Sequence, residues 1–296
     1  MAPTKEAASA AEAEATRHLL DLSHDEQSIV TQELCDPLRP LLAVHLSSTA
    51  NGLWLVMREQ LVELRQQHAE AAAMARAWGM SCAALADETQ LWLGGEDEYA
   101  LTLTHWSTLG MLVGCGSLPW LARLYIDGDD NGDEGVAALA DGLRRGRLPS
   151  LHVLHLDDAQ IGPHGAAALA PALTERALPS LAFLSLAGNP LGDAGLAALL
   201  PALRRLPPLK GLSLLGTNIG DEGVASLVAQ PTAGALKSLE ELYLDENQIT
   251  DEGCATLASA LRGGTLPALK ELALYFNPAS EEAQDAVQAA LDARSA

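Results

Sequence analysis

The chain has 296 residues, a net charge of −21 and 48% hydrophobic residues, which is enough apolar sequence for a large core in one or two domains. The acidic balance repels phosphate backbones and argues against nucleic-acid binding. No apolar run reaches the roughly 18 residues of a membrane span, and the opening residues lack the hydrophobic stretch of a secretory signal.

The four cysteines, Cys35, Cys82, Cys115 and Cys254, show no paired spacing. Unpaired cysteines are typical of a reducing compartment, so we expect a cytoplasmic or nuclear protein. Cys254 stands where equivalent stretches carry Val, Ala or Leu, and we expect it to be a small core residue.

Residues 1–18 are rich in Ala and Glu and predict a disordered tail. Residues 19–88 predict a helical unit, within which a three–four spacing of apolar residues favours one long helix over 53–78. This stripe either packs within the chain or binds a partner helix. All five tryptophans lie before residue 121, which indicates packing different from that of the rest of the chain.

Residues 29–56, "IVTQELCDPLRPLLAVHLSSTANGLWLV", resemble an F-box, the three-helix segment that docks substrate receptors onto a ubiquitin ligase. The resemblance rests on Leu38, Pro40, Leu46, Ser47, Thr49 and Leu53. Thr49 replaces the usual Val, and Leu53 stands where Trp is common. The resemblance implies that a Skp-type adaptor binds Leu38, Pro40, Leu46 and Leu53. The alternative is a helical segment that caps the domain after it.

Residues 89–120 contain a strand-like piece, "TQLWLGG", and a helical piece, and they predict a degenerate, capping copy of the unit that follows. That unit recurs six times over 121–296. The copies start at Leu121, Leu151, Leu181, Leu209, Leu239 and Leu269, and each opens L-x-x-L-x-[LI]. Leucines at positions four and six share one face of a strand, and stretches such as "GDEGVAALADGLRRG" place Val136, Leu139 and Leu143 on one stripe of a helix.

This pattern resembles the leucine-rich repeat, L-x-x-L-x-L-x-x-N, and its period of 28–30 residues resembles the ribonuclease-inhibitor-like subclass. The resemblance implies an α/β fold: a right-handed solenoid with parallel strands on a concave face and helices on a convex face, preceded by the α-helical N-terminal unit. Acids open the helices and arginines close them, so we expect one acidic and one basic rim.

The stretch "DGDDNGDEG" at 127–135 matches the first half of an EF-hand loop, but Ala138 stands at position twelve, where a bidentate carboxylate is needed. "GDEG" also recurs at 220–223 and, as "TDEG", at 250–253. We therefore interpret Asp133 and Glu134 as acids that complement a helix N-terminus, with a weak calcium site as the alternative. His155 and Asp157 alone are too few ligands for a metal site, and we expect no metal and no cofactor.

Positions three, five, seven and eight of each unit are expected to lie on the concave face or its edge, and five of the six Phe and Tyr residues occupy them. Exposed aromatics on a rigid face are favoured interface anchors. The predicted partner-binding residues are Arg123, Tyr125, Asp127, His155, Asp157, Phe183, Glu241, Tyr243, Asp245, Glu271, Tyr275 and Phe276. Their acids favour a partner protein with basic or mixed charge.

The sequence contains no G-x-S-x-G elbow, P-loop, H-E-x-x-H or paired-Cys motif. We therefore expect a non-enzymatic protein-binding module. Two alternatives stay open: a substrate-recognition subunit of a ubiquitin ligase, which would use residues 29–56, and a regulator of the Ran GTPase-activating type, which shares only the repeat.

Overall fold

The computed structural model describes residues 37, 51–94, 101–128, 131–229 and 234–294, with backbone alone for 51–61 and 234–235. The chain divides into two compact units, residues 1–86 and 87–296. None of the described helices is long and apolar enough to cross a membrane.

The first unit contains a long helix, α4 (Asn51–Ala77), close to the range that the apolar spacing predicts. Leu64, Ala71 and Ala75, three of the residues at the predicted three–four spacing, are buried. His68 lies halfway along it, with its Nδ1 atom 2.6 Å from the carbonyl oxygen of Pro37. A short helix, α5 (Cys82–Asp87), follows at the boundary with the second unit. The predicted tail and most of the F-box-like segment, including Leu38, Pro40 and Leu46, lie outside the described residues.

The second unit is built on one parallel sheet of seven strands, in which each strand pairs with the next along the chain. The strands are β1 (Gln90–Gly94), β2 (Arg123–Asp127), β3 (Val153–Asp157), β4 (Phe183–Ser185), β5 (Gly211–Ser213), β6 (Glu241–Tyr243) and β7 (Glu271–Ala273). Each strand from β2 to β7 starts two residues after a predicted repeat leucine. The predicted α/β solenoid of parallel strands is confirmed.

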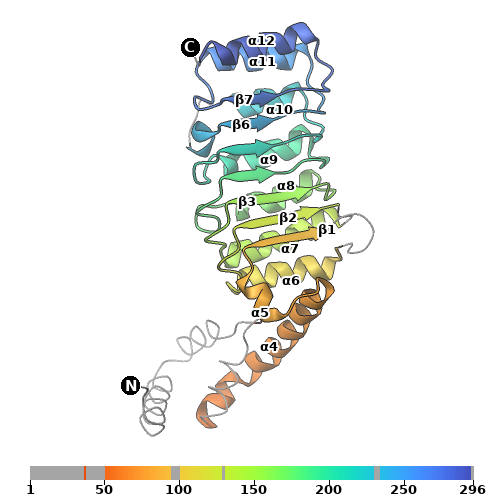
Figure 1. Cartoon of the computed structure of the whole chain (residues 1–296), viewed down its shortest axis with the longest axis vertical. Coiled ribbons are helices and arrows are strands. Elements are labelled where there is room, and N and C mark those ends of the chain that lie inside the picture. The colour runs from red at the N-terminus through yellow and green to blue at the C-terminus, as the bar shows by residue number, and fades with distance from the viewer. Residues whose placement is uncertain (1–36, 38–50, 95–100, 129–130, 230–233, 295–296) are drawn as a thin grey trace. The chain divides into compact units, whose positions relative to one another are not determined.

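Helices form the second layer, behind the strands in Figure 1. They are α6 (Leu103–Gly114), α7 (Gly132–Arg145), α8 (Pro163–Leu169), α9 (Gly192–Leu203), α10 (Asp221–Val228), α11 (Asp251–Arg262) and α12 (Glu281–Asp292), with 3-10 turns η1 (Ala170–Ala172) and η2 (Gly234–Ser238). The core lies between the layers and is made mainly of leucine. Val136, Leu139, Leu143 and Cys254 are buried there, as the sequence predicts.

Residues 89–120 have the same strand-then-helix order as the repeats, because β1 is followed by α6. β1 pairs with β2 in unbroken register, from Gln90 opposite Arg123 to Gly94 opposite Asp127. The degenerate copy therefore contributes a full strand to the sheet.

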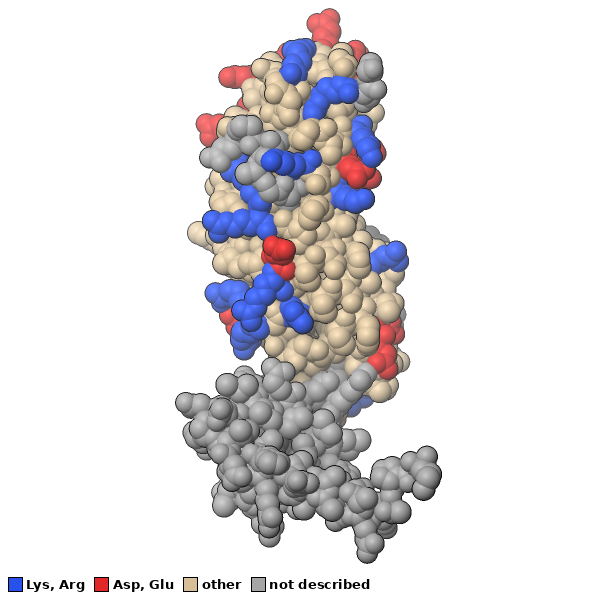
Figure 2. Space-filling model, turned by 90° about the vertical axis from the view of Figure 1, so that its left-hand side faces the viewer, with Lys and Arg blue, Asp and Glu red and all other residues tan. Residues whose placement is uncertain are grey.

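Charge is sorted between the two ends of the helices. The helices begin beside the strand ends, and the first turns of α7, α9, α10, α11 and α12 contain acids. They end beside the strand starts, where Figure 2 shows Lys and Arg gathered along the edge. Arg144, Arg145 and Arg262 occupy last turns on that edge. Acids near a helix N-terminus and cations near its C-terminus both complement the helix dipole.

The recurring "GDEG" has a structural role that the capping interpretation only partly anticipates. The carboxylate of Asp133 accepts a hydrogen bond from the backbone N–H of Gly162, at the start of the next repeat's helix, at 2.7 Å. Equivalent bonds join Asp193 to Gly220, Asp221 to Thr250 and Asp251 to Ser280. Each aspartate thus satisfies an N–H group that the following helix leaves unpaired.

A second row of bonds runs through the asparagines at position nine. Asn247 is buried, and its Oδ1 atom accepts the backbone N–H groups of Thr217 and Ile219 in the preceding repeat. Its Nδ2 group donates to the carbonyl oxygens of Leu214 and Leu244. Asn189 and Asn277 form the same kind of bonds. These contacts hold neighbouring strands in register and so fix the side chains on the outer face of the sheet.

Candidate functional site

The candidate site is the face of the sheet turned away from the helices, here called the strand face. In β2 the side chains of Leu124 and Ile126 point into the core, while those of Arg123, Tyr125 and Asp127 alternate with them on the strand face. No described element crosses this face in Figure 1. The parallel register aligns equivalent side chains of neighbouring strands into columns.

Four rings form a continuous stack across the strands β1 to β4. Trp92 and Tyr125 lie face to face, with ring centroids 3.9 Å apart and planes 13° apart. Tyr125 contacts the tilted ring of His155 at 4.8 Å, and His155 stacks on Phe183 at 5.3 Å. We call Trp92, Tyr125, His155 and Phe183 the aromatic ladder. Offset and stacked aromatic pairs of this kind stabilise one another beyond the area they bury.

The ladder ends at β5, where Gly211 has no side chain and leaves room for the ring of Phe183. A Cβ atom built on Gly211 would lie 2.2 Å from Cδ2 of Phe183, which is far inside van der Waals contact. The ring of Phe183 therefore occupies the space that a side chain on β5 would fill. Beyond it, Ser185 and Ser213 are buried and small, so no large side chain projects from the middle of the strand face.

Trp92 was not among the predicted partner-binding residues, although it is 65% exposed and ends the ladder. The sequence contains the signal that would have found it. Leu91 and Leu93 flank Trp92 as Leu124 and Ile126 flank Tyr125, and the register places Trp92 opposite Tyr125. Residues 89–120 do not keep the leucine spacing of the six repeats, so the sequence pattern alone does not align Trp92 with Tyr125.

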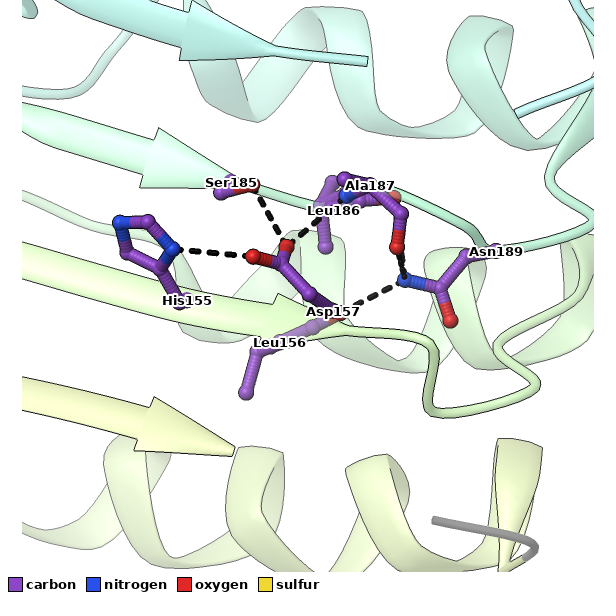
Figure 3. Close-up of polar contacts among 7 residues, drawn as sticks. All are labelled: His155, Leu156, Asp157, Ser185, Leu186, Ala187 and Asn189. Atoms are coloured by element: carbon purple, nitrogen blue, oxygen red, sulfur yellow. Dashed lines mark hydrogen bonds and ion pairs between the residues drawn. The ribbon is translucent and has the colours of Figure 1, made fainter. Parts of the chain in front are cut away.

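Two predicted partner-binding acids mainly tie neighbouring strands together. Asp157 Oδ1 accepts hydrogen bonds from the Ser185 hydroxyl and from the backbone N–H of Ala187, and Asp157 Oδ2 lies 2.9 Å from His155 Nδ1 (Figure 3). Asp245 is buried and accepts the backbone N–H of Tyr275 at 2.8 Å. Each carboxylate is bonded to the next repeat through its Oδ1 atom, so these acids shape the strand face more than they present charge on it.

Other acids on this face are more accessible. Asp127 is exposed at the end of β2, and Asp158 is exposed just beyond β3. Partial burial raises the pKa of Asp158, and the nearby charges of Asp127 and Asp157 raise it further. The three carboxylates therefore form a locally negative edge where the strands β2 and β3 end.

The strands β6 and β7 place acids at the opposite edge. Glu241 and Glu271 lie directly opposite each other at the strand starts. The Tyr243 hydroxyl donates to Glu241 Oε2 at 3.3 Å. Burial, followed by the charges of Glu241 and Glu271, raises the pKa of Tyr243 above its usual value, so the phenol keeps its proton and remains a donor.

Tyr275 and Phe276 extend from the loop after β7 and are 69% and 83% exposed. Phe276 has a φ of 58°, in the left-handed region. Three other repeats have glycine at this position, Gly128, Gly188 and Gly216, and two have acids. A bulky residue in this conformation is uncommon and costs free energy, which makes Phe276 an unusual surface residue.

The described residues include no group of three or more His, Cys, Asp and Glu side chains that could hold a metal ion. In the EF-hand-like stretch, Asn131 Nδ2 donates to the carbonyl oxygen of Leu101, and Asp133 is bonded to Gly162. Two polar groups of this stretch, those of Asn131 and Asp133, thus serve the repeat architecture.

Comparison with known proteins agrees with this geometry. A family model described as "Leucine Rich repeat" matches residues 147–170, 177–200 and 235–258, which fall within the repeats described above. The chain contains leucine-rich repeats. Its strand-plus-helix units of 28–30 residues are of the ribonuclease-inhibitor-like type, as the sequence predicts.

Two solved structures are similar to this leucine-rich-repeat protein. Leiomodin-1 Actin-Binding Site 2 is 15% identical with a TM-score of 0.38, and the match covers 66% of this chain and 91% of that one. The tropomodulin C-terminal domain of Caenorhabditis elegans is 16% identical with the same TM-score, covering 66% of this chain and 94% of that one. A comparison with curated proteins finds no match.

Solenoids of repeats offer long, preformed faces to other proteins, so this leucine-rich-repeat protein is a protein-interaction module. The adaptor-binding role predicted for Leu38, Pro40, Leu46 and Leu53 concerns residues whose side chains lie outside the described part of the chain. It stays a prediction.

Proposed function

We propose that the protein is a non-enzymatic interaction module that binds a partner protein on its strand face, the face predicted to be concave. The observation that carries this proposal is the aromatic ladder. Trp92, Tyr125, His155 and Phe183 form a preordered aromatic strip on a face that no described element covers. Rigid aromatic side chains are frequent energetic anchors of protein interfaces because they bury a large area with little loss of side-chain freedom.

The ladder is also held rigidly, which favours binding without rearrangement. Its strands are fixed by the main-chain register and by side-chain bonds such as those of Asp157 and Asn189. A face that is ordered before binding loses less conformational entropy when the partner arrives. Acids predominate around it, so we expect a partner segment of basic or mixed charge.

Affinity capture with paired tryptophan variants tests this function. The wild-type chain, Trp92→Ala and Trp120→Ala are immobilised, and the proteins retained from a cell lysate are quantified by mass spectrometry. Trp120 is a matched control because it is 60% exposed and lies outside the strands. We expect a partner that the wild type and Trp120→Ala retain and that Trp92→Ala loses. Retention of every partner by Trp92→Ala would contradict the proposal.

A further inference from the structure

Acids of the strand face lie at both edges of the sheet. At β2 and β3 the exposed acids Asp127 and Asp158 lie where the strands end, while Arg123 lies at a strand start. At β6 and β7 the acids Glu241 and Glu271 lie where the strands start, and a further acid, Glu246, is exposed just beyond the end of β6. The pair Asp127 and Asp158 and the pair Glu241 and Glu271 thus lie at opposite corners of the sheet, and the line that joins them is here called the diagonal.

The residues between these corners place no large side chain across the diagonal. Ser185, Gly211 and Ser213 are buried and small, and they occupy β4 and β5 between the two acidic groups. The ring of Phe183 lies over Gly211, at the border of this stretch of small residues. An extended chain could therefore cross the sheet here without meeting a large side chain.

An aromatic residue stands beside each acidic group. Tyr125 is two residues before Asp127 on the same face of β2 and stacks on Trp92. Tyr243 is hydrogen-bonded to Glu241 and lies beside Glu271. An arginine guanidinium can stack on an aromatic ring while its planar edge pairs with a carboxylate, which an ammonium group does less well.

We infer that the strand face recognises an extended protein segment with two clusters of arginine, which lies along this diagonal. The inference rests on the proposed function and names the chemistry of its partner. Three strand spacings from β3 to β6, about 4.8 Å each, combine with roughly four residues along a strand, about 13 Å, to give about 20 Å. An extended chain spans this distance in about six residues. A polyanion is disfavoured because Arg123 is the single Lys or Arg within the described strands. Lys210 and Lys270, which directly precede β5 and β7, are both paired with Glu240.

Synthetic peptides with two arginine pairs test the spacing. Fluorescein-labelled peptides Arg-Arg-(Gly-Ser)n-Arg-Arg, with n from one to five, are titrated with the full-length chain at physiological salt and followed by fluorescence anisotropy. We expect the tightest binding near n = 3, at least about fivefold tighter than at n = 1, because a short linker prevents both pairs from binding together. The lysine version with n = 3 is expected to bind more weakly. An affinity that is independent of linker length would overturn the inference.

Matched charge variants separate this diagonal from general attraction to an acidic protein. The pair Glu241→Gln/Glu271→Gln removes two charges on the strand face, and Glu222→Gln/Glu252→Gln removes two exposed charges at helix starts in adjacent repeats. For the n = 3 peptide we expect about tenfold weaker binding with the first pair and less than about twofold with the second. Equal losses would mean that net charge alone attracts the peptide, and the inference would be wrong.

The proposed function can survive failure of this inference. If the arginine peptides do not bind, but Trp92→Ala still loses a partner in affinity capture, the strand face is an interaction surface for a partner of other chemistry. If the peptides bind with the expected spacing and Glu241→Gln/Glu271→Gln weakens them, the inference stands independently of which cellular protein carries the segment.

Discussion

The carboxylate of Asp193 fills the space above the Cα atom of Gly223 in the following repeat. Asp193 Oδ1 accepts the backbone N–H of Gly220 at 2.7 Å, and a Cβ atom on Gly223 would lie 2.4 Å from that oxygen. Gly165 and Gly253 face Asp133 and Asp221 in the same way. The last glycine of the "GDEG" motif therefore makes room for the aspartate of the repeat before it.

Replacing Gly223 with Ala should lower stability by about 1–3 kcal/mol, because the new methyl group displaces a bonded carboxylate from a packed position. Gly195→Ala is the matched control. Repeat two has Pro163 where repeats one, three, four and five have the aspartate. The atoms nearest to a Cβ atom on Gly195 therefore belong to Leu191 and Ala166, at 3.1 Å or more. Urea unfolding followed by circular dichroism compares the two, and equal losses would argue against the steric explanation.

The position-nine asparagines should differ in importance according to their burial. Asn247→Ala leaves the backbone N–H groups of Thr217 and Ile219 without acceptors inside the core, and we expect a loss of about 3 kcal/mol or more. Asn277→Ala removes the same chemistry from the last repeat, where the residue is partly exposed. Asn277→Ala is therefore the control, and its free energy of unfolding, measured with urea, should fall clearly less than that of Asn247→Ala. A similar fall in both variants would contradict this account.

Gly211→Ala should disturb the aromatic ladder while largely preserving the fold. The new methyl group would meet the ring of Phe183, which is partly exposed and can rotate away from His155 at modest cost. We expect a changed near-UV circular dichroism spectrum, an unchanged far-UV spectrum and weaker partner binding. Ser213→Ala on the same strand is the control, and it should leave the near-UV spectrum as in the wild type. An unaltered spectrum in Gly211→Ala would show that the stack tolerates a side chain there.

Asp158→Asn should stabilise the chain in a pH-dependent manner. Because the folded-state pKa of Asp158 is raised, by burial first and then by Asp127 and Asp157, the folded state binds this proton more tightly than the unfolded state. The contribution of Asp158 to stability therefore falls as pH rises through the folded-state pKa. Asparagine tolerates the φ of 49° at this position.

At neutral pH the Asp158→Asn variant should be more stable than the wild type by less than about 1 kcal/mol, since the site is mostly exposed and solvent screens the repulsion. Well below the usual Asp pKa of about 3.9 the difference should vanish. Urea midpoints of both proteins across this range provide the measurement. A stabilisation that persists at low pH would assign the effect to something other than charge.

The regular part of the fold could be predicted because it follows from a repeated pattern. Leu121 and its five equivalents predicted where β2 to β7 start, since alternation decides which side chains enter the core. β1 was predicted only as a strand-like piece. Its tryptophan was grouped with those of the N-terminal region rather than with Tyr125.

The candidate site was predicted less completely, for a physical reason. Alternation tells which face a side chain lies on, but not whether it turns toward solvent or toward the next strand. Asp157 and Asp127 occupy the same column, yet the first binds Ala187 while the second is exposed. The difference depends on the neighbouring repeat, whose Ser185 offers a hydroxyl. The partners of the helix-start aspartates were missed for the same reason, because they lie about thirty residues away.

The rows of aspartate and asparagine bonds are unevenly distributed, and this has a consequence for how the array comes apart. Among the described residues, repeats four and five are joined by both Asp221 and Asn247, and repeats five and six by both Asp251 and Asn277. Repeats three and four have the Asp193 bond, but Thr217 replaces the asparagine.

In a linear array, stability is set by nearest-neighbour coupling. Judged by these two rows of bonds, the coupling in the C-terminal half should be weakest between repeats three and four. Under denaturant or tension, repeats four to six should open as one cooperative block, separately from the repeats before them. That boundary lies inside the diagonal proposed for a partner segment, so a segment bound along the diagonal would join repeats four to six to the repeats before them.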